Sequence, residues 1–311
     1  GIGRRQRQMC IRDSNETNRL NSLILGLPDD FGGTPSLEAC YDPQSRFHVN
    51  NNTFPLQKEV TNELNDLLQV FHKYDVVVYR PENIIGLNQV FARDIGFVLG
   101  DKFVVANVIE DRKEEVPAIK SITDKISPKK LIKLPKDAFA EGGDIIIHNN
   151  YVFVGVSNDE DYQKLQVTRT NYNGFNFLKE KFSHLQFFAF ELNKSDHIPE
   201  DNSLHLDCCF QPIGENKAII SPKGFKDKND VNQLIKLFGD DNVLLVTSKE
   251  MSNMYTNIFS ISKNVIISDP RFVRLNDWLE KNGFTVEKVA YNEISKMGGL
   301  FRCSTLPLSR E

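Results

Sequence analysis

The sequence predicts an α/β fold in which five similar strand–strand–helix–strand units close into a ring with pseudo-five-fold symmetry. Short apolar, β-branched runs pair as hairpins, a helical or loop segment and another strand follow each hairpin, and this unit recurs about every 45 to 65 residues. Repeated units of this length cover one another's apolar faces. No linker separates the units, so residues 15–311 are expected to form a single domain. The alternative is an α+β fold whose hairpins only look periodic.

Four hairpins carry the pattern, and each turns at a short polar or glycine-containing pair. They span residues 95–108 with a turn at Gly100-Asp101, 144–156 at Asn149-Asn150, 204–221 at Gly214-Glu215, and 257–268 at Lys263-Asn264. The clearest helices that follow are 172–182, 231–238 and 272–281, and they precede strands at 186–192, 243–246 and 285–290. These segments supply four of the five units.

The two ends of the chain supply the fifth unit. Apolar residues at 300–308 and 23–27 can pair as strands, and a helix at 58–74 and a strand at 76–79 follow. Pairing of the N-terminal and C-terminal segments would close the ring.

Composition excludes several classes of protein. The 311 residues are 40% hydrophobic and 26% charged, as in ordinary globular proteins. The formal net charge is −4, and basic residues are scattered among acidic ones, so a nucleic-acid partner is not expected. No apolar run is long enough to cross a membrane and no signal-peptide core is visible, which favours a cytoplasmic protein. The sequence leaves open whether the chain forms a homo-oligomer.

The first fourteen residues, GIGRRQRQMCIRDS, are basic and show no periodicity, so we expect an extraneous or disordered segment that includes Cys10. The five cysteines form no CxxC pair, and no histidine stands at zinc-ligand spacing. A disulfide framework and a structural metal site are therefore not expected.

A polar residue without an obvious structural role precedes each hairpin. These residues are Asp94, Glu141, His205 with Asp207, Asn257, and Cys303. In a ring of equivalent units, equivalent positions converge on the axis. Three carboxylates gathered there would repel one another unless a cation neutralised them. The arrangement therefore predicts a site for a positively charged ligand.

Four motifs follow one another along the chain. They are Phe91-Ala92-Arg93-Asp94, Glu141-Gly142-Gly143-Asp144, His205-Leu206-Asp207, and the C-terminal MGGLFRCSTLPL that contains Cys303. Together they resemble the guanidino-group-modifying superfamily, whose members include arginine deiminase, dimethylarginine dimethylaminohydrolase and glycine amidinotransferase. The resemblance runs from about residue 20 to the end of the chain. It implies the pentein fold, a five-bladed ββαβ propeller.

The resemblance also implies roles for individual residues. Cys303 matches the nucleophile, His205 the general acid/base, and Glu141 a carboxylate that supports the histidine. Asp94 and Asp207 match carboxylates that bind the guanidinium nitrogens. Asn257 matches a recurrent substrate-site asparagine more loosely, one layer behind the others. Candidates for the carboxylate and amine of the substrate are Arg46, Arg271, Arg274 and Arg302.

The chemistry of a guanidinium independently favours these residue types. A carboxylate can hold the planar cation through two hydrogen bonds, and a thiolate is nucleophilic near neutral pH and leaves well. The expected reaction is metal-free and cofactor-free hydrolysis of an arginine-like molecule through an amidino-cysteine intermediate, giving citrulline and ammonia or methylamine. The first alternative is transfer of the amidino group to an amine such as glycine. A further alternative is a noncatalytic pentein that only binds a partner.

Other residues receive structural interpretations. Cys208 and Cys209 are expected to pack in the interior. The histidines other than His205 are expected to face solvent: His48, His72, His148, His184 and His197. The lysine-rich stretches 125–136 and 223–228 are expected to be solvated loops. Gly32-Gly33-Thr34-Pro35 is either a lid over the site or a plain surface turn.

Overall fold

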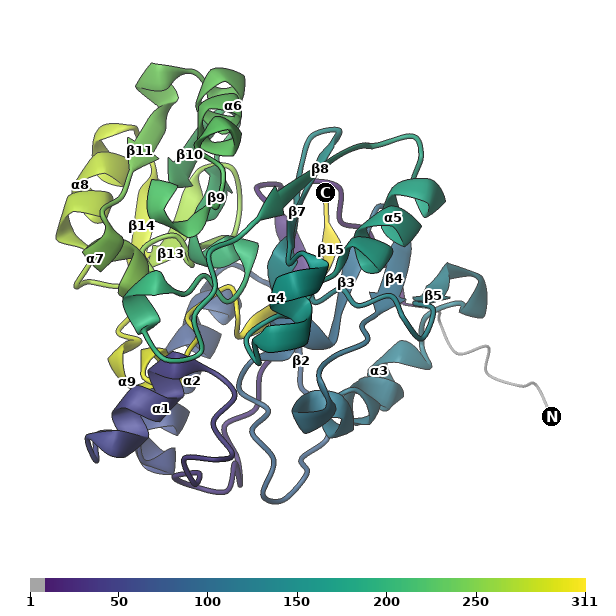
Figure 1. Ribbon diagram of the computed structural model, residues 1–311, viewed down its shortest axis with the longest axis vertical. Coiled ribbons are helices and arrows are strands. Elements are labelled where there is room, and N and C mark those ends of the chain that lie inside the picture. Colours follow the sequence, from purple (N-terminus) through teal and green to yellow (C-terminus); the bar gives the residue numbers. More distant parts are fainter. Residues whose placement is uncertain (1–8) are drawn as a thin grey trace.

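A computed structural model describes residues 9–311 and contains five three-stranded sheets (Figure 1). In every sheet the middle strand pairs antiparallel with one neighbour and parallel with the other. The sheets, which we call blades, are β15 (Thr305–Arg310), β1 (Leu20–Leu25) and β2 (Val77–Tyr79); β3 (Gly96–Leu99), β4 (Lys102–Val105) and β5 (Leu131–Lys133); β6 (Ile145–His148), β7 (Tyr151–Val156) and β8 (Gln186–Glu191); β9 (Phe210–Ile213), β10 (Lys217–Ile220) and β11 (Val243–Leu245); β12 (Phe259–Ser260), β13 (Val265–Ser268) and β14 (Thr285–Lys288). The predicted fold class and its fivefold repetition are confirmed.

Helices make the crossovers that parallel pairing requires. The connections from middle to third strand contain α2 (Gln57–Lys73), α3 (Lys120–Thr123), α4 (Asp159–Lys164) with α5 (Tyr172–Lys181), α6 (Lys228–Phe238) and α8 (Val273–Lys281). The connection from β1 to β2 also contains α1 (Pro43–Asn50), whereas α7 (Ser248–Ser252) and α9 (Asn292–Ser295) lie between blades. Among the described residues, no helix has the length and apolar character needed to cross a membrane.

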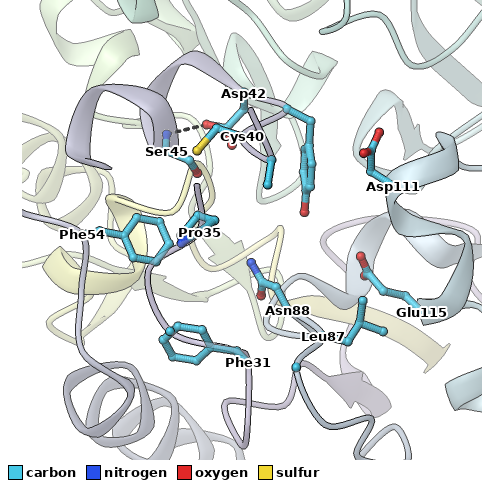
Figure 2. A pocket seen from close by; sticks show the side chains of 14 residues that line it. Phe31, Pro35, Cys40, Asp42, Ser45, Phe54, Leu87, Asn88, Asp111 and Glu115 are labelled. Carbon is cyan, nitrogen blue, oxygen red and sulfur yellow. Dashed lines mark hydrogen bonds between the residues drawn. The ribbon is translucent and has the colours of Figure 1, made fainter. Parts of the chain in front are cut away.

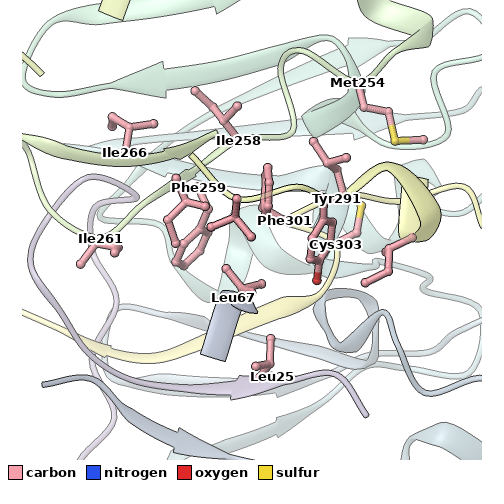
Figure 3. Packing of buried hydrophobic residues seen from close by; sticks show 14 of the residues in the cluster. Leu25, Leu67, Met254, Ile258, Phe259, Ile261, Ile266, Tyr291, Phe301 and Cys303 are labelled. Atoms are coloured by element: carbon pink, nitrogen blue, oxygen red, sulfur yellow. The ribbon is translucent and has the colours of Figure 1, made fainter. Parts of the chain in front are cut away.

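Helix α2 shows how the crossovers are held. Its fully buried residues are Val60, Leu64, Leu67 and Phe71, at the spacing that places side chains on one face of a helix. They join a core cluster that also contains Phe259, Phe301 and Tyr291. Figure 3 shows Cys303 at one end of this cluster, close to Tyr291 and Phe301. Cys303, the candidate nucleophile, therefore packs against buried apolar side chains.

The two chain ends meet in one blade, as predicted. Strand β15 pairs antiparallel with β1, with Leu23 opposite Pro307 and Leu25 opposite Thr305. Strand β2 pairs with the other side of β1, so β1 is the middle strand of this blade. This pairing closes the ring.

The N-terminal segment differs from the expectation in part. Residues 1–8 lie outside the described residues, but residues 9–14 pack on the fold. Ile11 is buried, the backbone of Arg12 bridges to Ser309, and that of Asp13 bridges to Gly100. The sequence shows no periodicity here because the segment adds single bridges to existing strands and forms no element of its own.

A buried arginine links all five blades at the centre of the ring. The fully buried Arg302 precedes β15, and its guanidinium forms an ion pair of 2.7 Å with Glu16 and one of 2.9 Å with Asp207. It also donates to the carbonyl oxygens of Gly142, Gly143 and Ile145. Its backbone N–H donates to Asn257, and its carbonyl oxygen accepts from Arg93.

We predict that Arg302→Met lowers the free energy of unfolding by about 3–5 kcal/mol, because Glu16 and Asp207 would remain buried without their cation. Urea unfolding of the purified protein measures this change. The matched control is Arg274→Met, whose ion pair with Glu250 is half exposed and should contribute less than about 1 kcal/mol. Equal losses in the two variants would contradict a structural role for the central arginine.

Candidate active site

Three of the expected residues, Asp94, His205 and Cys303, line one cavity, and a fourth, Glu141, lies behind the imidazole of His205. Asp94 lies in the 3-10 turn η1 (Ala92–Ile95), Glu141 precedes η5 (Gly142–Asp144), His205 precedes η7 (Leu206–Cys208), and Cys303 lies in the turn before β15. All four are buried. The cavity is small, about 20 Å³, and is lined by Tyr41, Asp42, Phe91, Asp94, Arg112, Arg169, Leu204, His205, Met297, Gly298 and Cys303.

Hydrogen bonding fixes the imidazole of His205. Its Nε2 lies 2.8 Å from Oε2 of Glu141. Its Nδ1 lies 3.8 Å from Oδ1 of Asp94 and has no hydrogen-bond partner among the described residues. A Cβ on Gly143 would come within 2.6 Å of the imidazole, so glycine is required for this close approach. The Glu-Gly-Gly motif thus provides both the partner and the space for the histidine.

Three acids keep His205 protonated. Burial alone would lower its pKa, but Asp94, Asp144 and Glu141 raise the pKa of His205 to about 9. At neutral pH the unliganded site therefore holds an imidazolium, which can donate a proton from Nδ1 to an atom bound in the cavity.

Asp94 is shared between the site and a buried arginine. Arg112 donates to its Oδ2 at 2.6 Å, and the backbone N–H of Gly143 donates to its Oδ1 at 3.2 Å. Burial opposes ionisation, but His205 and Arg112 outweigh it and lower the pKa of Asp94. Arg112 also forms a two-point ion pair with Glu115, which holds it in place.

Cys303 is held by its backbone and is a neutral thiol in the unliganded site. Its N–H donates to Oδ1 of Asn257 at 3.2 Å, and its carbonyl oxygen accepts from the N–H of Arg93 at 3.0 Å. Burial, followed by the charges of Asp207 and Asp94, raises the pKa of the Cys303 thiol well above its ordinary value. Formation of the thiolate therefore needs an added positive charge close to the sulfur.

Asp207, which was predicted to bind the guanidinium nitrogens, and Asn257, which was predicted to lie one layer behind them, both lie outside the cavity lining. Both are fully buried. Asp207 is bound by Arg302, and Asn257 accepts the N–H groups of Arg302 and Cys303. The motifs are correct in position along the chain, but these two side chains turn inward to the ring centre.

The four arginines proposed for the ends of the substrate lie away from the cavity. Arg302 pairs with Glu16 and Asp207 at the ring centre, Arg271 pairs with Asp269, and Arg274 pairs with Glu250. Arg46 donates to the carbonyl oxygen of Cys40 and lines a separate surface hollow.

Two arginines that the sequence did not single out line the cavity instead. Arg112 binds Asp94, and Arg169 lies 3.7 Å from Glu141 with a buried Nε that has no hydrogen-bond partner in the described chain. Arg112 lies in the short 3-10 turn η2 (Glu110–Glu115) and Arg169 in a loop, so no periodicity marks them in the sequence. Their presence gives the cavity cationic as well as anionic walls.

The remaining cysteine and histidine expectations are mostly met. Cys208 and Cys209 are buried. His148 was expected to face solvent but is buried, with Nε2 3.1 Å from the carbonyl oxygen of Glu215. It occupies the last position of β6, where the alternation of a strand directs it inward.

A second hollow adjoins the site and shares Tyr41 and Asp42 with it. Figure 2 shows Phe31, Pro35 and Cys40 on one side of this hollow and Asp111 and Glu115 on the other. Gly33 and Pro35 of the expected lid segment belong to its wall. Closure of this segment over the site remains a prediction.

The oxygen and nitrogen atoms of Asp94, Glu141 and His205 lie within 4.8 Å of one another, a spacing that could also hold a metal ion. The positive charge of Arg112 on Asp94, of Arg169 beside Glu141, and of protonated His205 neutralises this group without a metal. We therefore assign no metal to these residues.

Comparison with known proteins gives matches over most of the chain. Residues 38–310 match the family described as "N,N dimethylarginine dimethylhydrolase, eukaryotic". The uncharacterized protein YkgA of Bacillus subtilis is 31% identical over 257 residues, which are 81% of this chain and 81% of that protein. An arginine deiminase of Mycoplasma capricolum is 26% identical over 203 residues, covering 57% of this chain and 48% of the deiminase.

Solved structures share the fold at lower identity. SxtG, an amidinotransferase from Microseira wollei, matches with a TM-score of 0.76 and 16% identity over 97% of both chains. The N-terminal domain of ArgZ, a cyanobacterial arginine dihydrolase, matches with a TM-score of 0.77 and 18% identity over 93% of this chain and 98% of that domain. Both likenesses show that this chain shares the fold of these proteins.

The raised pKa of His205 predicts a pH-dependent contribution to stability. Because the pKa in the folded chain, about 9, lies above the ordinary value of 6.5, protonation stabilises the folded state; the contribution is complete below pH 6.5 and is lost as the pH rises through about 9. Unfolding free energies of wild type and His205→Gln, measured in urea at about pH 6 and about pH 9, should differ more at the lower pH, by on the order of 1–3 kcal/mol. A difference that does not change with pH would contradict the protonated histidine.

Proposed function

This chain belongs to the N,N dimethylarginine dimethylhydrolase family, and on that premise we propose that it is a cysteine-dependent hydrolase of a free guanidino compound. Arginine or an N-methylated arginine would be converted to citrulline, with release of ammonia or methylamine. The observation that carries the proposal is the single buried cavity lined by Cys303, His205 and Asp94, with Glu141 behind the imidazole. A binding protein without catalysis would have no use for a thiol and an acid at ring-equivalent positions.

The walls of the cavity suggest how the substrate lies. Oδ1 of Asp94 is the carboxylate oxygen that Arg112 leaves free, and it can accept from the guanidinium of the substrate. Arg169, with an unpartnered Nε, and Arg112 are the cations of the cavity wall. We assign them to the carboxylate of an amino-acid substrate, in place of the arginines selected from the sequence.

Arrival of the substrate would activate the nucleophile. The neutral thiol of Cys303 is maintained by burial and by the negative charges of Asp207 and Asp94. A bound guanidinium offsets those charges, the thiol proton leaves to solvent, and the thiolate attacks the central carbon of the guanidinium. The nucleophile would thus form only in the presence of its substrate.

His205 would then act twice. The imidazolium gives its proton to the departing amine, the carbon–nitrogen bond breaks, and an amidino thioether remains on Cys303. The neutral imidazole next takes a proton from water as the oxygen attacks the same carbon. Collapse of this second adduct breaks the carbon–sulfur bond, releases the ureido product and restores the thiolate.

Transfer of the amidino group to an amine is the second candidate, favoured by the likeness to the amidinotransferase SxtG along 97% of the chain. The first half of the reaction is the same, and only the acceptor differs. The purified protein should be incubated with arginine, methylated arginines and agmatine, with and without glycine. Citrulline independent of glycine supports hydrolysis, whereas ornithine that appears only with glycine contradicts it. A preference for arginine over agmatine would support the carboxylate assignment to Arg112 and Arg169.

We predict that Cys303→Ser abolishes turnover, by at least about a thousandfold, while the protein stays folded. The reason is that a serine hydroxyl is not ionised by a neighbouring cation near neutral pH. Mass spectrometry of acid-quenched wild-type protein should show an amidino adduct on Cys303. The control is Cys209→Ser, another buried cysteine, which should retain both activity and adduct. Near-normal turnover by Cys303→Ser would refute the mechanism.

A further inference from the structure

Two charged side chains, the buried Asp144 and the partly buried Lys194, hold the backbone on either side of His205. Oδ1 of Asp144 accepts from the N–H of Leu206 at 2.9 Å. Nζ of Lys194 donates to the carbonyl oxygen of Leu204 at 2.6 Å. The residues immediately before and after the histidine are therefore tied by side chains from elsewhere in the chain.

Both side chains come from the blade that precedes the His205 turn. Asp144 is the last residue of η5 and leads directly into β6, and Lys194 follows β8. The middle strand of that blade, β7, makes room for the contact: a Cβ on Gly155 would lie 2.3 Å from Oδ1 of Asp144. The absence of a side chain at Gly155 thus leaves room for the Asp144 carboxylate beside the turn that leads into the next blade.

We propose that Asp144 and Lys194 are positioning residues for His205, which fix the backbone around it so that Nε2 meets Glu141 and Nδ1 faces the cavity. The inference rests on the proposed function, because it assigns a purpose to the orientation of the general acid/base. A displacement of about 1 Å in such a group can cost on the order of a hundredfold in rate.

The charge of Asp144 has a second effect on the imidazole. The charged or titratable groups around His205 are Asp94, Glu141, Asp144, Arg169, Lys194, Cys303, and Arg112 through its bond to Asp94. Asp94, Asp144 and Glu141 all favour the imidazolium. Burial raises the pKa of Asp144 itself, and the charges of His205 and Lys194 oppose that rise.

Asp144→Asn separates charge from shape, because an amide oxygen can still accept from Leu206. We expect the pKa of His205 to fall by on the order of one unit, measured by NMR titration of the ring in the unliganded protein, with His205→Gln used for assignment. The basic limb of the pH dependence of kcat should shift in the same direction. The matched control is Asp269→Asn, another buried aspartate that accepts a backbone N–H, from Tyr291. An unchanged titration of His205 in Asp144→Asn would overturn the electrostatic part of the proposal.

Lys194→Met removes the donor and keeps the apolar stem. We expect kcat to fall by roughly tenfold to a hundredfold with little change in KM, because the orientation of His205 is altered and substrate contacts are not. The control is Lys217→Met, because Lys217, the first residue of β10, likewise donates through Nζ, to Oδ1 of Asn242 in the 3-10 turn η9 (Asp240–Asn242). Equal kcat in Lys194→Met and wild type would overturn positioning by this residue.

The NMR titration needs no turnover, so it distinguishes the two proposals. A lowered pKa in Asp144→Asn together with full activity of Cys303→Ser would support the positioning pair and refute the proposed function. If the pKa of His205 and the kcat are unchanged in Asp144→Asn and Lys194→Met while Cys303→Ser is inactive, the positioning pair is refuted and the proposed function is supported.

Discussion

The buried guanidinium of Arg302 is the interaction on which the ring depends. Five blades that converge on an axis bury backbone carbonyls and carboxylates together, and one cation with a fixed fork of donors satisfies them. Arg302 also lies one residue before Cys303. The residue that links the blades is therefore adjacent to the candidate nucleophile, so the stability of the fold is coupled to the geometry of the site.

In three of the turns that meet at the axis, one residue faces the centre of the ring and a nearby residue faces the cavity. Arg93 contacts the carbonyl of Arg302 while Asp94 faces the cavity, and Arg302 occupies the centre while Cys303 lines the cavity. In the third turn His205 faces the cavity and Asp207 pairs with Arg302. Each of these three turns thus contributes one side chain to the centre of the ring and one to the cavity, which is how residues distant in sequence form one pocket.

The sequence predicts the ring because strand alternation, turn residues and a regular spacing are local signals. The same signals do not tell which side chain of a turn points inward, so Asp207 was predicted to bind the guanidinium, whereas its side chain pairs with Arg302. Arg112 lies in the 3-10 turn η2 (Glu110–Glu115) and Arg169 in a loop, and only the folded chain reveals their ion pairs with Asp94 and Glu141. Residues 9–14 add single bridges to existing strands, which leave no periodic pattern.

The charge balance of the unliganded site explains why a guanidino substrate suits it. The surplus of carboxylates keeps a proton on His205 and, with burial, another on Cys303, so the site holds its acid ready and its nucleophile inactive. A neutral urea, such as the proposed product, brings no charge to reverse this state, whereas a guanidinium does. In the proposed reaction the same electrostatics would select the substrate, trigger the attack and allow the product to leave without reacting again.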